Sequence, residues 1–100
     1  MARMSAAIQA IETAFPAGTR LSRPRGGYFV WVALPQGLDA MRLHQAALQV
    51  GIGIAPGQIF SPDHRFTDCI RINCGHPAAE VLPAVQRLGA LVHALLRASA

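Results

Sequence analysis

The chain has no lysine: its nine basic side chains are all arginines, against five acidic ones, which gives a formal net charge of +4 over 100 residues. A nucleic-acid surface usually gathers its basic residues into a stripe with aromatic residues between them. The local cluster here is Arg20, Arg23 and Arg25, beside a glycine-containing turn. We therefore expect no direct binding of nucleic acid by this chain.

Cysteine is scarce as well. Cys69 and Cys74 are too few for a disulfide framework and are not spaced as in a zinc knuckle, so we expect reduced thiols. No uninterrupted apolar run approaches the ~20 residues that a membrane span needs. The start of the chain lacks the continuous apolar block of a signal peptide. These absences predict a cytoplasmic protein with no membrane partner.

What the sequence has in plenty is apolar residues. It is 52% hydrophobic and only 14% charged, a composition that excludes intrinsic disorder. One hundred residues suffice for one hydrophobic core and are too few for two. We expect a single domain over residues 1–100.

Hydrophobic periodicity predicts an alternation of helices and strands. The predicted elements are a helix over residues 3–15, an edge strand over 19–22, a strand over 28–34, a helix over 39–50, a short strand at 52–54, a strand over 69–73 and a helix from about 79. This order predicts an α+β fold: a small three- to four-stranded sheet with helices packed on one face. Residues 28–34 are apolar on both faces, which indicates that a part of the protein outside these 100 residues covers the second face.

Local signals support the predicted helix ends. Asp39 is placed to cap the helix that follows it, and Gly51 is a natural residue for the left-handed turn after that helix. Pro83 is compatible with the last helix only if the helix starts near Ala79, which leaves the proline in or just past the first turn.

A metal site can be imagined from Cys69, Cys74, His64 and His76, but the pattern does not favour it. The two cysteines are an odd number of residues apart, so a regular strand would place them on opposite faces. Zinc requires four ligands that converge at ~2.0–2.3 Å. We therefore expect ordinary thiols and no metal.

Two further patterns have simpler explanations as turns. Ser61, Asp63 and His64 are residue types of a hydrolase triad, but neighbours in one turn rarely converge as nucleophile, base and orienting acid. Gly26-Gly27 lacks both the spacing of a phosphate loop and a following helix. We expect no catalytic residue in this chain.

The segment DCIRINCG places a charge inside a short apolar strand. Strand alternation puts Cys69, Arg71 and Asn73 on one face, opposite the two isoleucines. Because a guanidinium cannot lose its proton, Arg71 must meet an anion or be fully hydrogen-bonded if it is buried.

Two interpretations of Arg71 remain open from spacing alone. In the first, Arg71 pairs with Asp63, Asp68 or Glu80 of this chain, or is exposed on an edge strand. In the second, its paired donors form a planar fork that binds the carboxylate of a ligand.

Three motifs in order resemble a known family: RPRGGYFVWVALPQGLD, GIGIAPGQIFS and FTDCIRINCGHP. Together they resemble the small C-terminal domain of fold-type-I, pyridoxal-phosphate-dependent aminotransferases. More narrowly, they resemble the aminotransferase-like half of the MocR branch of GntR-family transcriptional regulators. The resemblance extends from about Phe15 to Leu96.

The resemblance implies that Arg71 binds the α-carboxylate of an amino-acid substrate or effector. It also implies that five other residues border the same cleft: Gly26, Gly27, Pro56, Gly57 and Phe60. In the family, pyridoxal phosphate is carried on a lysine of the large domain. This chain has no lysine, and the large domain and any winged-helix domain are absent from it.

The sequence is therefore expected to be a C-terminal fragment of a larger protein that binds no cofactor by itself. The resemblance implies a homodimeric parent that is either an aminotransferase or a regulator, with any DNA binding through the absent N-terminal domain. The alternative is a free-standing α+β binding or scaffold domain with Arg71 in an internal salt bridge.

Overall fold

The computed structural model describes residues 2–22, 29–60, 65–75 and 77–99. The helices and strands in chain order are α1 (Ala2–Ala14), β1 (Arg20–Ser22), β2 (Phe29–Ala33), α2 (Ala40–Gln49), β3 (Ala55–Pro56), β4 (Cys69–Asn73) and α3 (Ala78–Ser99). Two short 3-10 helices, η1 (Pro35–Gly37) and η2 (Gly57–Phe60), add single turns. The order of the helices and strands is the one predicted from periodicity.

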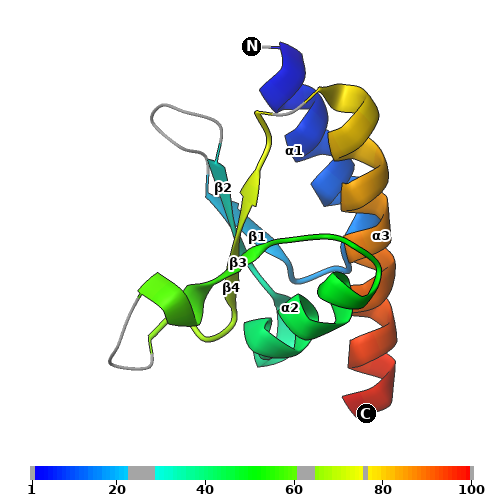
Figure 1. Cartoon of the computed structure of the whole chain (residues 1–100). Coiled ribbons are helices and arrows are strands. Elements are labelled where there is room, and N and C mark those ends of the chain that lie inside the picture. The colour runs from blue at the N-terminus through cyan, green and yellow to red at the C-terminus, as the bar shows by residue number, and fades with distance from the viewer. Residues whose placement is uncertain (1, 23–28, 61–64, 76, 100) are drawn as a thin grey trace.

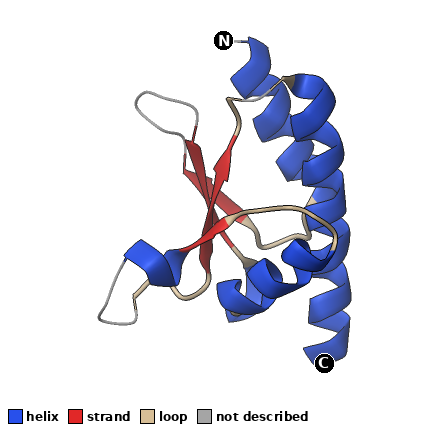
Figure 2. Cartoon of the chain, in the orientation of Figure 1, coloured by secondary structure: helices blue, strands red, loops and turns tan. Residues whose placement is uncertain are grey.

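The four strands form one antiparallel sheet in the order β1-β2-β4-β3. In the ladder between β2 and β4, Trp31 lies opposite Arg71, and on the other side of β4 Ala55 also pairs with Arg71. Helices α1, α2 and α3 pack on the same face of this sheet (Figures 1 and 2). The predicted α+β class, with a small sheet and helices on one face, is confirmed.

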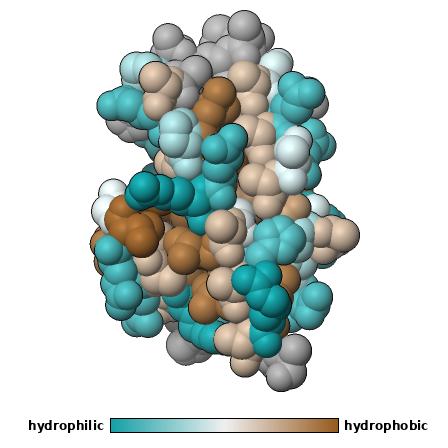
Figure 3. Space-filling model, turned by 90° about the vertical axis from the view of Figure 1, so that its right-hand side faces the viewer, coloured by the Kyte–Doolittle hydropathy of each residue, from teal (hydrophilic) through white to brown (hydrophobic). Residues whose placement is uncertain are grey.

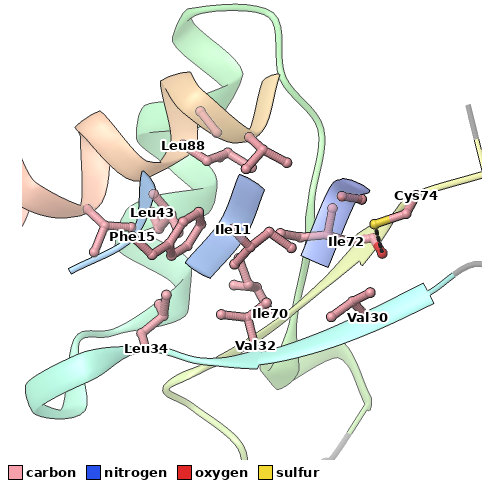
Figure 4. Packing of buried hydrophobic residues seen from close by; sticks show 14 of the residues in the cluster. Ile11, Phe15, Val30, Val32, Leu34, Leu43, Ile70, Ile72, Cys74 and Leu88 are labelled. Carbon is pink, nitrogen blue, oxygen red and sulfur yellow. Dashed lines mark hydrogen bonds between the residues drawn. The ribbon is translucent and has the colours of Figure 1, made fainter. Parts of the chain in front are cut away.

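The hydrophobic core lies between the sheet and the helices (Figure 4). Alternate residues of the two central strands point into it, with Val30 and Val32 from β2 and Ile70 and Ile72 from β4. The helices contribute fully or almost fully buried side chains, among them Ile11, Leu43, Val85, Leu88 and Val92, and Phe15 adds another just after α1. Each buried Leu, Ile, Val or Phe side chain contributes about 1.5–3 kcal/mol relative to an exposed one, so this layer accounts for most of the stabilisation.

The predicted helix ends are largely confirmed. The Asp39 side chain accepts a hydrogen bond from the Met41 backbone N–H at 2.9 Å and so caps α2, and Gly51 follows the helix with a φ of 78°. Pro83 lies inside α3, which begins at Ala78. Pro83 is the sixth residue of this helix and lies just past its first turn, so α3 lacks the hydrogen bond that an N–H at this position would donate to the Ala79 carbonyl.

The short strand predicted at Ile52 and Ile54 is present but begins later, since β3 covers Ala55–Pro56 and residues 52–54 lie outside it. Ile52 and Ile54 are half-buried and pack against the core, whereas the ladder contacts to β4 are made by Ala55 and Pro56. The apolar alternation therefore reflects packing onto the core and not strand pairing. The residues that follow β3, Gly57–Phe60, form the turn η2.

Helix α3 is long and apolar. Within the part of the chain that the structure describes, Ala79–Ala98 is the one segment whose length and composition would allow a membrane span, at a hydropathy of 1.2. Core helices of soluble proteins meet the same criterion, and one side of α3 is buried in the core through residues such as Val85 and Leu88. The outer side, viewed in Figure 3, mixes hydrophilic and hydrophobic residues.

Candidate functional site

The sheet face opposite the helices carries the side chains that the core excludes. Because Val30, Val32, Ile70 and Ile72 point into the core, strand alternation turns their neighbours to this open face. These neighbours are Phe29, Trp31 and Ala33 of β2 and Cys69, Arg71 and Asn73 of β4. All six are half-buried or exposed, and the predicted common face of Cys69, Arg71 and Asn73 is thereby confirmed.

Two phenylalanine rings flank the guanidinium of Arg71. Its Cζ lies 4.1 Å from the centre of the Phe29 ring and 4.7 Å from the centre of the Phe60 ring. Phe29 belongs to β2 and Phe60 to the turn after β3, and these strands lie on opposite sides of β4. Each cation–π contact contributes about 0.5–1 kcal/mol at a partly exposed site.

Further aromatic contacts extend this arrangement. The Trp31 and Phe60 rings meet edge to face, with centroids 5.3 Å apart and planes at 72°, and the Phe66 ring lies 6.3 Å from Trp31. Arg65 lies over Phe66 at 5.4 Å. We call Phe29, Trp31, Phe60 and Phe66 the aromatic cluster. Three of its members, Phe29, Trp31 and Phe66, were not predicted as site residues.

An internal partner for Arg71 is not found among the described residues, where its recorded contacts are the two rings. The carboxylate of Asp68 accepts a weak hydrogen bond from the Cys69 thiol, with Sγ and Oδ1 3.6 Å apart. Glu80 lies at the first turn of α3 and lines a groove with Ile72 and Val85. The third predicted partner, Asp63, lies outside the described residues.

The turn that carries Phe60 is fixed at several points. Gly57 is buried, and a Cβ there would collide with the backbone oxygen of Phe66 and lie 3.0 Å from that of Cys69. Gln58 Nε2 donates to Asp39 Oδ1 at 2.8 Å and to the Thr67 carbonyl at 3.1 Å. These contacts set the position from which Phe60 reaches Arg71.

The other residues predicted to border a cleft have different positions. Pro56 is buried and pairs with Ile70, one residue from the pair between Ala55 and Arg71, so Pro56 and Gly57 supply backbone next to the site and Phe60 supplies a side chain. Gly26 and Gly27 lie outside the described residues.

The two cysteines face in different directions. Cys74 is fully buried in the core, and burial raises the pKa of its thiol. Cys69 lies half-buried on the open face, where burial and then the neighbouring Asp68 carboxylate raise its pKa. Within the described ranges no three His, Cys, Asp or Glu residues lie close enough to hold a metal ion. His64 and His76 fall outside those ranges.

No family model matches the chain, but several curated proteins are similar to it. The chain is 39% identical over 83 residues to an uncharacterized aminotransferase of Saccharolobus solfataricus. The aligned segment covers 82% of the chain and 21% of that protein. The chain is also 37% identical over 91 residues to the uncharacterized HTH-type transcriptional regulator YdcR of Escherichia coli. This alignment covers 90% of the chain and 19% of the regulator.

Solved structures that superpose on the chain are also aminotransferases. LysN, the α-aminoadipate aminotransferase of Thermus thermophilus, superposes with a TM-score of 0.85 at 30% identity, over 95% of the chain and 25% of LysN. Along most of its length the chain is similar to fold-type-I aminotransferases. It matches the small domain of these proteins, and the resemblance to both enzymes and MocR-like regulators is confirmed. The chain spans about a fifth of the length of the curated relatives that it matches.

Proposed function

We propose that the chain is the ligand-clamping small domain of a larger, pyridoxal-phosphate-dependent protein, in which Arg71 binds the carboxylate of an amino-acid substrate or effector. One observation carries this proposal: on the open sheet face, the guanidinium contacts the rings of Phe29 and Phe60 and has no carboxylate partner among the described residues. A cation fixed in this way is suited to an anion that comes from outside the domain.

The chemistry of the guanidinium favours a carboxylate. Its planar donors match the two oxygens of a carboxylate in a bidentate pair, and each charged hydrogen bond contributes about 1.5–3 kcal/mol. Arg71 is half-buried next to apolar rings, so the pair forms where water competes less than at an open surface. In LysN, the solved complex contains N-(5'-phosphopyridoxyl)-L-leucine, a compound that joins the cofactor to an amino acid.

The cofactor of this family is pyridoxal phosphate, but the residues of this chain do not fit it. A Schiff base to the cofactor requires a lysine, and the sequence has none. Arg71 suits the carboxylate end of the ligand. The large domain of the same polypeptide would hold the cofactor and supply the chemistry, and these 100 residues would be the C-terminal part of that polypeptide.

Closure of this domain over a bound amino acid has a different use in each kind of parent. In an enzyme, closure excludes water and orients the bonds at the α-carbon. In a regulator, the ligand favours the closed arrangement through contacts that the open one lacks, which makes closure a switch. Of the two parents we favour the regulator, dimeric and bound to DNA through a separate domain, because of the resemblance carried by the motif DCIRINCGHP. Coverage does not separate the two, since YdcR matches 90% of the chain and LysN 95%.

The carboxylate site can be tested on the chain itself. We expect side-chain NMR signals of Arg71 to shift on titration with sodium acetate and not with sodium chloride at equal ionic strength. Two charged hydrogen bonds, offset by the entropy of association, predict a Kd on the order of 10 mM.

Two variants serve as controls for that titration. Arg71→Gln should abolish the acetate-dependent shifts of its neighbours, and Arg71→Lys, which keeps the charge but loses the fork, should weaken them. An equal response in the wild type and Arg71→Gln would reject the proposal.

A further inference from the structure

We infer that Phe29 and Phe60 are positioning residues, which hold the Arg71 guanidinium ready for a carboxylate before any ligand arrives. The inference rests on the proposed function and adds to it the means by which the cation is kept in place. It also limits the ligand group to one that can approach the guanidinium past two rings, as a flat carboxylate does.

The geometry supports a two-sided clamp. The ring centres of Phe29 and Phe60 lie 4.1 and 4.7 Å from Cζ, both within the ~6 Å of an effective cation–π contact. One ring comes from the strand on one side of β4 and the other from the turn after the strand on its other side. The two rings that contact Arg71 therefore come from elements on either side of its own strand, and the Phe60 ring reaches across to Trp31 of β2.

Such restraint matters because a free arginine side chain has many rotamers to lose. Ordering a flexible side chain on binding is a cost that lowers affinity, and a side chain ordered beforehand avoids most of it. The clamp uses neutral rings, so it holds the cation without neutralising it. A salt bridge would hold Arg71 equally well but would compete with the ligand for the same donors.

Both rings are themselves supported. Phe60 also meets Trp31 edge to face at 5.3 Å, and its turn is tied to Asp39 and Thr67 through Gln58. Phe29 is part of the β2 ladder opposite Asn73. The rings are 39% and 41% exposed, so their removal should leave the core intact.

The test uses leucine variants of the rings in the full chain, with acetate as the probe. Phe29→Leu and Phe60→Leu should each raise the acetate Kd about two- to fivefold, the loss expected for one partly exposed cation–π contact. Each should also move the Nε–H resonance of Arg71 in the ligand-free chain, because an aromatic ring shifts nearby protons. Phe60→Tyr keeps a ring and should bind like the wild type.

Phe66→Leu is the matched control, since Phe66 belongs to the aromatic cluster but contacts Trp31 and Arg65 in place of Arg71. It should leave both readouts unchanged, and thermal melts should show that every variant is folded. Leucine variants that bind acetate as well as the wild type would overturn the inference while the carboxylate site stands. A wild-type chain that does not respond to acetate would reject the proposed function. In that case the Nε–H resonance of Arg71 still tests the ring contacts, and a resonance that is unchanged in the leucine variants would overturn the inference as well.

Discussion

Gln58 donates a hydrogen bond to the same Asp39 oxygen, Oδ1, that caps helix α2, at 2.8 Å, and so joins the turn carrying Phe60 to the start of that helix. One carboxylate thereby serves two elements. The link runs from the helical layer of the domain to the aromatic cluster on its open face. The position of Phe60 beside Arg71 depends on this hydrogen bond as well as on strand β3, which precedes its turn.

Asp39→Ala should remove both the cap of α2 and the hydrogen bond from Gln58. The loss of a helix cap costs about 0.5–2 kcal/mol, and we expect a total near the upper end of that range because a second bond is lost. Urea unfolding measures the change. Asp39→Asn keeps an acceptor oxygen and should cost less. Equal losses in the two variants would show that the shared oxygen is not what matters.

Gly57→Ala should destabilise the domain by about 1–3 kcal/mol, the typical cost of overpacking, because the new Cβ would collide with the Phe66 backbone. The matched control is Gly53→Ala, where a Cβ has no neighbour within 4 Å. That change should be within about 0.5 kcal/mol of the wild type or slightly stabilising. Urea titrations of both variants give the comparison, and similar free energies of unfolding for the two would contradict it.

Arg71→Gln should change stability little, by about 1 kcal/mol or less, since it removes contacts to two half-exposed rings and no ion pair among the described residues. Removing one partner of a buried salt bridge would cost about 3–5 kcal/mol. Chemical denaturation therefore separates the proposed role from a buried internal pair. A loss of the larger size would favour the internal pair.

Cys69 should react slowly with thiol reagents at neutral pH. Burial and the Asp68 carboxylate raise its pKa above the ordinary 9.0, so little of the reactive thiolate is present. Asp68→Asn removes one of these causes, lowers the pKa and should speed labelling of Cys69 at pH 8. Mass spectrometry assigns the label to Cys69 or to the buried Cys74. An unchanged rate at Cys69 would rule out the influence of Asp68.

If the chain is part of a larger protein, the native polypeptide should be several times heavier than the 10.6 kDa of these residues, as its relatives are. An antibody raised against the chain and used on an extract of the source cells measures that mass. A single band near 10.6 kDa would favour the free-standing domain.

The sequence predicted the elements whose periodicity is strong and local. The alternation of Ile70, Arg71 and Ile72 placed the guanidinium on the correct face of β4, and Asp39 marked the start of α2. The start of the short strand β3 was predicted too early, at Ile52, because apolar alternation appears in a loop packed on the core as readily as in a strand. Periodicity reports burial and does not report pairing.

The aromatic clamp could not be predicted in the same way. Phe29, Phe60 and Arg71 are far apart in the sequence and meet only through the register of β2 with β4 and the path of η2. Neither is encoded in a local pattern. The resemblance to the family singled out Arg71 and Phe60 but not Phe29, whose role follows from the register.

The most direct test is a crystal structure of the chain grown in the presence of acetate. We predict both carboxylate oxygens within hydrogen-bond distance of the Arg71 guanidinium, with the Phe29 and Phe60 rings still on either side of it. A structure in which Arg71 is paired with an acidic side chain of its own chain, and acetate is bound elsewhere or nowhere, would contradict the account.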